Sequence, residues 1–265
     1  MNVVEDFSLL VAAFIASLFG QGGGVLYTPL QVWYGVGFHT AAPTSLFLIL
    51  IISISSTLVF RKAQQVDWKA ALVMEAPTTL GALIGGILSR FIPSQMLGWI
   101  MAFLLITAGW FMLNRPKERS NRLINLHPSR WIWSHDMHGE MIQLDLRIML
   151  PIMMTVGLLT SMVGIGGGAL KVPIMVLLFG IPLPIAVGSS AFMVGLTAAA
   201  GLLGHITGGG FNWTAALLLS IPVFIGGQIG SRLSVHMDTV RLKKWFAVFI
   251  LLIAVMSLIR SGSFV

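Results

Sequence analysis

The sequence repeats one glycine-rich pattern within apolar surroundings, as GQGGGVLYTP from Gly20 to Pro29 and as GIGGGALKVP from Gly164 to Pro173. Each glycine costs roughly 1 kcal/mol in a helix interior relative to alanine, so four within five residues should interrupt a helix. An unwound backbone inside a bilayer is tolerated only where it is buried in protein or lines a cavity. We therefore expect two broken helices, each directing unpaired N–H groups and the positive end of a helix dipole at a bound anion.

One charged residue follows the second glycine run. Lys171 lies three residues after Gly168, in the first turn of the expected short helix. A cation there opposes the helix dipole, and its burial in a membrane is costly, so a facing anion would explain it. Alternatively, Lys171 extends to the membrane interface. Its counterpart Tyr27 could donate its hydroxyl to the ligand or pack in the core, and Gln21 replaces Ile165, so the two halves of the site differ chemically.

Hydroxyl side chains open the span that follows each glycine unit. Thr44 and Ser45 follow the first unit, and Ser189 and Ser190 follow the second. A hydroxyl can donate to an oxyanion without adding charge, although such residues also bond neighbouring helices to one another. The expected substrate-binding residues are Gly20, Gln21, Gly22, Gly23, Gly24, Tyr27, Thr44, Ser45, Gly164, Gly166, Gly167, Gly168, Lys171, Ser189 and Ser190.

Glu75 is the only carboxylate well inside an expected span. It is a candidate for proton coupling, because intramembrane carboxylates commonly relay protons. The alternative is an interfacial ion pair with Lys69, a turn or two away.

An enzymatic site is not expected. The chain has no cysteine, and His205 has no evident partner, so we assign no catalytic residue. A histidine cluster at His127, His135 and His138, with Asp136, could bind a metal. Polar residues clustered in a loop beside a membrane are usually solvated, so we assign no metal and no cofactor.

Composition indicates a polytopic helical membrane protein. Of 265 residues, 56% are hydrophobic and 9% are charged, and the mean hydropathy is +0.91. The net charge of +7 does not indicate a nucleic-acid partner, because the basic residues lie between apolar runs, where orientation signals occur. The N-terminal stretch lacks the positive region of a signal peptide and is expected to remain in the mature chain. The expected surroundings are a lipid bilayer, and self-association is left open.

The apolar runs predict an all-α chain built from two repeats. Short helix pairs are expected at 7–19 with 25–38 and at 148–163 with 169–181. Full-length spans are expected at 40–60, 68–89, 95–113, 183–203, 212–231 and 245–259. The first transmembrane repeat is thus 1–113, a polar cytoplasmic linker loop is 114–147, and the second transmembrane repeat is 148–265.

The repeat can be followed residue by residue. Gly20 and Pro29 match Gly164 and Pro173 at an offset of 144. Later, at an offset of 145, Trp68, Pro77, Gly81 and Gly85 match Trp213, Pro222, Gly226 and Gly230. Ordered matches of Gly, Pro and Trp indicate an internal repeat of the kind found in transporters. The paired glycines Gly81/Gly85 and Gly226/Gly230 are small-xxx-small patterns typical of helix packing.

The basic residues favour one orientation of the repeats. If each glycine unit dips into the membrane and returns, 13 Lys and Arg residues lie on one side and 2 on the other; if each unit crosses, the counts are 10 and 5, with Lys171 left out of both. Because cytoplasmic loops are enriched in Lys and Arg, the dipping arrangement is preferred. It predicts inverted repeats, each with a re-entrant helix pair and three transmembrane helices. A hydropathy plot would still count about eight segments.

The paired G-x-G-G-G…P motifs, with the P-x-x-x-G-x-x-x-G runs from Pro77 to Gly85 and Pro222 to Gly230, resemble the sulfite exporter TauE/SafE family. The resemblance implies a secondary transporter that exports a small sulfur-containing oxyanion, sulfite or an organosulfonate, across the cytoplasmic (inner) membrane. Alternating access around a central anion site is the expected mechanism. The alternatives are a proton-coupled transporter of a different small ion and a membrane-embedded protein without transport function.

Overall fold

A computed structural model describes residues 3–18, 24–113, 131–137, 140–207, 211, 213–238, 248, 251, 252 and 255. The described part of the chain is mostly helical, with one small β-hairpin. Its helices are α1 (Val3–Leu18), α2 (Gly24–Trp33), α3 (Phe38–Lys62), α4 (Trp68–Ser89), α5 (Ser94–Leu113), α6 (Leu146–Met162), α7 (Gly168–Leu177), α8 (Leu183–Ile206) and α9 (Trp213–His236). The hairpin consists of β1 (Ile132–Met137) and β2 (Glu140–Asp145).

Four of the described helices, α3, α4, α8 and α9, are long and apolar enough to cross a membrane. They correspond to the predicted spans 40–60, 68–89, 183–203 and 212–231. Helix α5 occupies the predicted span 95–113, and the short helices α1, α2, α6 and α7 flank the two glycine runs as predicted. Most of the span predicted at 245–259 lies outside the described residues.

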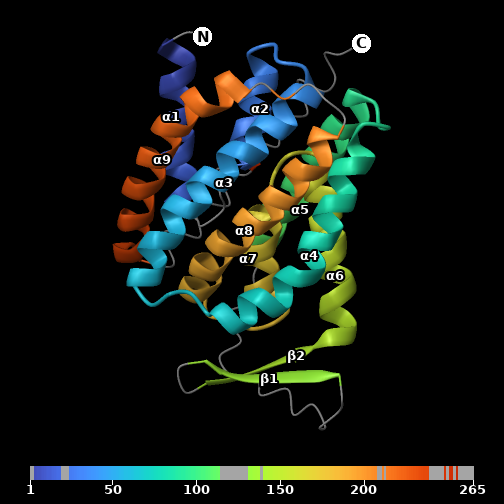
Figure 1. The fold of residues 1–265 in the computed structure, drawn as a ribbon. Coiled ribbons are helices and arrows are strands. Elements are labelled where there is room, and N and C mark those ends of the chain that lie inside the picture. The colour runs from blue at the N-terminus through green and yellow to red at the C-terminus, as the bar shows by residue number, and fades with distance from the viewer. Residues whose placement is uncertain are drawn as a thin grey trace.

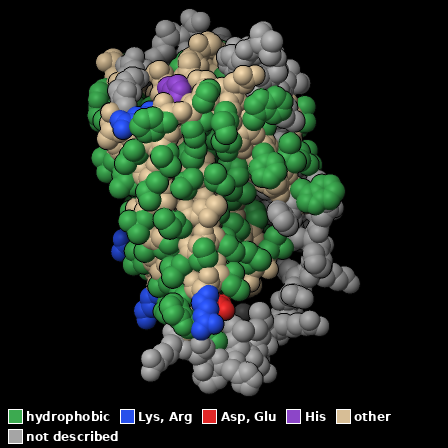
Figure 2. All heavy atoms as spheres, turned by 90° about the vertical axis from the view of Figure 1, so that its right-hand side faces the viewer, with side chains coloured by type: hydrophobic (Ala, Val, Ile, Leu, Met, Phe, Trp, Pro, Cys, Tyr) green, Lys and Arg blue, Asp and Glu red, His purple; other side chains and the backbone are tan. Residues whose placement is uncertain are grey.

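The surface of the bundle is apolar around its middle. Figure 2 shows a broad band of hydrophobic side chains, with Lys and Arg toward the two ends. Large apolar residues such as Leu80, Phe103, Leu203 and Ile221 are exposed on this surface. A contiguous exposed apolar surface of this kind faces lipid rather than water. With four helices able to cross a bilayer, the chain is a multi-pass membrane protein.

The two short helix pairs begin at opposite ends of the bundle (Figure 1). Helices α1 and α3 begin at the end that carries the N-terminus, and Tyr34, just after α2, donates a hydrogen bond of 3.2 Å to Ser8 near the start of α1. Helices α6 and α8 begin at the hairpin end, where the backbone N–H of Asp67 donates to the Ser189 hydroxyl at 2.9 Å. The short pair α1–α2 therefore begins and ends near the N-terminus, and the pair α6–α7 near the hairpin.

Packing across the bundle follows the same internal repeat. Helix α4 packs along α6 and α8, and helix α9 packs along α1 and α3. A Cβ placed on Gly81 would lie 2.1 Å from the Met154 carbonyl oxygen. On α9, a Cβ on Gly226 would lie 2.8 Å from the Leu10 carbonyl oxygen. The two contacts are copies of each other, because 226 − 81 is 145 and 154 − 10 is 144.

The second glycine in each run makes the matching contact. A Cβ on Gly85 would lie 2.2 Å from the Leu158 carbonyl oxygen, and one on Gly230 would lie 2.3 Å from the Phe14 carbonyl oxygen. These backbones touch because no side chain separates them. The prediction that the small-xxx-small patterns serve helix packing is confirmed.

The β-hairpin is the described feature that the all-helical prediction missed. In β2, buried Ile142 and Leu144 flank exposed Gln143, an alternation with the two-residue period of a strand. The signal is only six residues long and lies in the segment 114–147, which was predicted as a polar linker. On β1, His135 Nε2 lies 3.2 Å from Asp67 Oδ2. Asp67 also caps α4 by accepting from the Ala70 N–H at 2.9 Å, so the hairpin docks on the α3–α4 loop.

Candidate functional site

The second glycine run forms a tight turn between α6 and α7. Gly164, Gly166 and Gly167 have φ angles of 74°, 73° and 84°, in the left-handed region that glycine adopts without steric cost. A Cβ on Gly164 would also lie 2.7 Å from the Cα of Ala42 on α3. Both the backbone conformation and the close approach require glycine. The predicted helix break is confirmed for this copy of the motif.

The first helix pair contacts this turn. The Thr28 hydroxyl of α2 donates to the Gly164 carbonyl oxygen at 3.0 Å. On the same helix, the Gln31 amide donates to the Ser45 hydroxyl of α3 at 2.9 Å. In the first motif, Gly24 begins α2, and the other predicted site residues, Gly20, Gln21, Gly22 and Gly23, lie outside the described residues.

Lys171 lies in the first turn of α7 and is fully buried. Its Nζ lies 2.6 Å from Glu75 Oε2 on α4, and it also donates to the Thr197 hydroxyl on α8. Gly167 leaves room for the lysine stem, because a Cβ there would lie 3.2 Å from Lys171 Cε. Lys171 therefore does not extend to the membrane interface, and Glu75 pairs with Lys171 rather than with Lys69.

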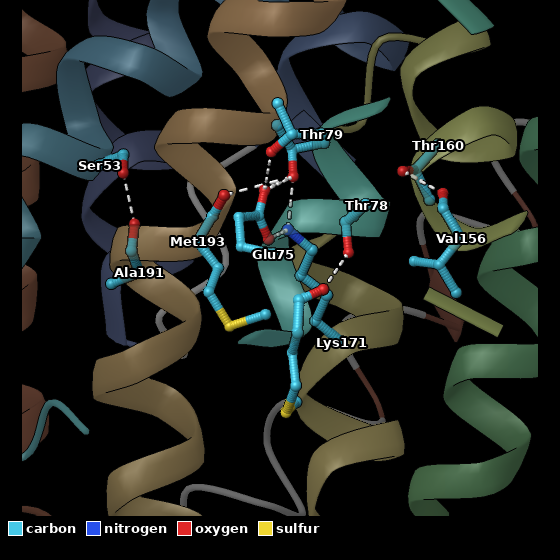
Figure 3. Close-up of polar contacts among 11 residues, drawn as sticks. Ser53, Glu75, Thr78, Thr79, Val156, Thr160, Lys171, Ala191 and Met193 are labelled. Carbon is cyan, nitrogen blue, oxygen red and sulfur yellow. Dashed lines mark hydrogen bonds and ion pairs between the residues drawn. The ribbon is translucent and has the colours of Figure 1, made fainter. Parts of the chain in front are cut away.

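The Glu75 carboxylate is also fully buried and accepts from several donors. Its Oε1 accepts from the hydroxyl of Thr197 and, at 3.2 Å, from that of Thr79. Figure 3 shows Lys171 and Glu75 pointing toward each other within this network. Glu75 lies eight residues beyond Asp67, or about 12 Å along the helix. Because α4 is long and apolar enough to cross a membrane, this depth is expected to place the pair within a hydrocarbon core of about 30 Å.

Such a pair is poorly explained by stability alone. Removing two charges from water costs several kcal/mol for each ion, and apolar replacements of buried pairs are often neutral or stabilising. Ionisable groups within membrane spans usually mark the pathway of a substrate or an ion. The pair of Lys171 and Glu75, with Thr197, is therefore the candidate functional site, and we refer to it as the buried pair.

The remaining predicted site residues lie in different surroundings. Thr44 donates within its own helix to the Thr40 carbonyl oxygen at 2.9 Å, and Ser189 bonds the α3–α4 loop. The hydroxyls of Tyr27 and Ser190 are buried and have no hydrogen-bond partner among the described residues.

Sequence reasoning missed Thr197. It lies in the middle of α8, where a lone threonine is easily taken for a packing residue. A signal was present, because Thr197 and Ser53 are separated by the repeat offset of 144 (197 − 53), so both copies carry a hydroxyl at this position. Ser53 donates to the Ala191 carbonyl oxygen of α8. Comparison of polar positions between the repeats could therefore have identified Thr197.

Comparison with known proteins places this chain in a family. The family described as Sulfite exporter TauE/SafE matches residues 7–257. The chain belongs to this family. The match spans both glycine units, so the buried pair lies within the region shared with other TauE/SafE proteins. Membership in a transporter family agrees with the expectation of a non-enzymatic function.

Curated relatives of this TauE/SafE chain are named as membrane transporters. "Probable membrane transporter protein YunE" of Bacillus subtilis (strain 168) is 31% identical over 241 residues, which cover 87% of each chain. "Probable membrane transporter protein MJ0441" of Methanocaldococcus jannaschii is 26% identical, covering 84% of this chain and 83% of its own. "Probable membrane transporter protein YfcA" of Escherichia coli (strain K12) is 26% identical, covering 86% and 78%. No solved structure matches. The family and these relatives support a role in membrane transport.

Proposed function

We propose that this TauE/SafE protein is a secondary transporter that exports a small sulfur-containing oxyanion, sulfite or an organosulfonate, across the cytoplasmic membrane. The observation that carries the proposal is the fully buried Lys171 in the first turn of α7, directly after the glycine turn. A cation at that position is repelled by the positive end of the helix dipole. An anion that contacts both the lysine and the helix N-terminus would offset this repulsion. The carboxylate of Glu75 satisfies the lysine in the structure described, and a substrate oxyanion would take its place.

Several groups near Lys171 suit an oxyanion. The first N–H groups of α7, those of Gly168 and Ala169, have no partner within the helix by position, whereas those of Leu170 and Lys171 donate to the Gly167 carbonyl oxygen. The Thr197 hydroxyl is bonded to Lys171 and could donate to a substrate oxygen. Among the predicted glycine ligands, Gly167 lies beside the Lys171 side chain, whereas a Cβ on Gly164 or Gly166 would already meet Ala42 or Ile49. Sulfite and sulfonate present several acceptor oxygens and little apolar surface, which matches this donor set.

The proposed mechanism is alternating access by two inverted repeats, 1–113 and 148–265. It is supported by the matched packing of α4 on α6 and α9 on α1, through Gly81 and Gly226. It is also supported by the opposite ends at which the helix pairs begin. Rocking of one repeat against the other would open the buried pair to each side in turn. The hairpin end, with Arg61, Lys62, Lys69 and Arg147 beside it, would face the cytoplasm.

The proposal is tested in liposomes loaded with radiolabelled sulfite. Efflux should be several-fold faster with the reconstituted protein than from protein-free liposomes. Unlabelled sulfite and ethanesulfonate should compete for the labelled anion, whereas exchange of sodium for potassium should have no effect. Equal efflux from both kinds of liposome would contradict the assignment.

One observation favours a second candidate, a proton-coupled transporter of a different small ion. Glu75 is fully buried, and a carboxylate is the group that would bind a cation. A thermal-unfolding series with sulfite, sulfate, ethanesulfonate, sodium and potassium separates the two. Stabilisation by anions supports the first proposal, and stabilisation by cations alone supports the second.

A further inference from the structure

We infer that Glu75 is an internal counter-anion that the substrate displaces, so that each bound anion is accompanied by one proton taken up on the Glu75 carboxylate. This inference rests on the anion-transport function proposed above. It adds a stoichiometry and a physical reason for the proton-coupling role expected of Glu75.

The first step is competition for the lysine. Lys171 Nζ contacts the Glu75 carboxylate at 2.6 Å and the Thr197 hydroxyl, and the side chain is fully buried. Because the carboxylate is the charged group in contact with Nζ, we expect an anion that binds the lysine to take the position of the carboxylate. Glu75 would retain the hydroxyls of Thr79 and Thr197 as neighbours.

The second step is the balance of charge. The empty site carries Lys⁺ and Glu⁻, with a sum of zero. A monovalent anion bound to Lys171 beside an ionised Glu75 gives a net charge of −1 in a buried site, which is heavily penalised. One proton from water, placed on a carboxylate oxygen of Glu75, restores the sum to zero. No bond within the substrate is formed or broken.

The hydrogen-bond network can accommodate both states. In the empty state the Thr197 hydroxyl donates to Glu75 Oε1. A hydroxyl is both donor and acceptor, and a protonated carboxyl has one O–H to donate. After proton uptake the carboxyl can donate to the Thr197 oxygen. Thr197 therefore keeps a partner in each state, and a serine or threonine is suited to this position where an alanine is not.

No other described charged group shares the site. The helices that surround Glu75 are α6, α7 and α8, together with α4 itself. On α4, Lys69 is exposed in the first turn. On α6, Arg147 lies over the Trp131 ring at 5.4 Å, in the first turn. On α8, the His205 ring bonds Ser89, at the end of α4 opposite to Lys69. Lys171 on α7 is the remaining charged residue described on these helices, and it pairs with Glu75.

The internal repeat does not generate a second copy of the pair. The repeat offsets place Tyr27 at the position of Lys171 (171 − 144) and Ser220 at the position of Glu75 (75 + 145). The corresponding position for Thr197 is Ser53. Hydroxyls replace both charges at these positions, so the repeat gives one such pair among the described residues. The expected stoichiometry is therefore one proton per anion.

The test is calorimetric titration of the purified full-length protein with ethanesulfonate. This anion stays fully ionised near neutral pH, so any proton taken up enters the protein. Titrations in bis-Tris and in Tris, at equal chloride, give the number of protons from the difference in buffer ionisation enthalpy. Sulfonate buffers are avoided because they could occupy the site. We expect about one proton per anion and a dissociation constant that rises tenfold per pH unit on the alkaline side.

The matched variant is Glu75→Gln, which keeps the shape and the hydrogen bonds but cannot titrate. It should bind ethanesulfonate with about zero protons taken up and with an affinity independent of pH. Binding by the unmodified protein with no proton uptake, or an equal pH slope in the variant, would overturn the inference and leave anion transport standing. Absence of binding by any anion would overturn both. If the variant does not fold, the proton count of the unmodified protein decides the matter.

Discussion

Replacement of Lys171 by methionine should abolish anion transport and also destabilise the protein by about 3–5 kcal/mol. The transport loss follows because Lys171 Nζ is the proposed cationic ligand. The stability loss follows because Glu75, fully buried and 2.6 Å from Nζ, would remain without its counter-charge. Chemical or thermal unfolding in detergent measures the second effect, and efflux from proteoliposomes measures the first.

A double variant separates the two effects. Lys171→Met combined with Glu75→Gln removes both charges, so most of the lost stability should return. Transport should not return, because the cation is still missing. Lys69→Met is the matched control: it removes an exposed lysine from the first turn of α4 and should change stability by no more than about 0.5 kcal/mol. If the single and double variants are equally unstable, or if either transports anions normally, the assigned role of the pair is wrong.

Replacement of Gly81 by alanine should be among the most damaging single-methyl changes in the described helices. The new Cβ would lie 2.1 Å from the Met154 carbonyl oxygen, and backbone cannot move aside as a flexible side chain can. Helices α4 and α6 would have to separate, at a cost of about 1–3 kcal/mol or more. The melting temperature in detergent and the yield of monodisperse protein both report the effect.

Gly37→Ala provides the control for this change. Gly37 precedes α3 with a φ of −59°, which alanine adopts readily, and no atom lies within 4 Å of its built Cβ. Its melting temperature should fall much less than that of Gly81→Ala, because the expected cost is only the weaker preference for alanine at an N-cap. Equal melting temperatures for the two alanine variants would show that the close contact of α4 with α6 does not limit stability.

Much of the fold could be predicted from the sequence because the bilayer restricts what a chain can do. Spans of about 20 apolar residues, with Lys and Arg between them, mark helices directly. The glycine run from Gly164 to Gly168 indicated a break because no packed helix accommodates so many glycines cheaply. Gly81 and Gly85 indicated close packing, and the partners found on α6 confirm that prediction. The hairpin escaped notice because two short strands in a charged segment carry little periodic signal.

The partner of Glu75 could not be predicted in the same way. Lys69 was the nearest lysine along the chain, whereas Lys171 is 96 positions away. Only the packing of α4 against the second repeat brings the two together. The sequence therefore indicated that Lys171 and Glu75 were functional candidates without indicating that they form one site.

The most direct test of a substrate site at Lys171 is to locate a bound anion by X-ray anomalous scattering, with selenite or selenate in place of the sulfur oxyanion. One selenium peak should lie about 4 Å from Lys171 Nζ, the separation set by one hydrogen-bonded oxygen, and Glu75 should have moved off the lysine. A fully occupied selenium peak elsewhere, with Lys171 still bonded to Glu75, would contradict the proposal.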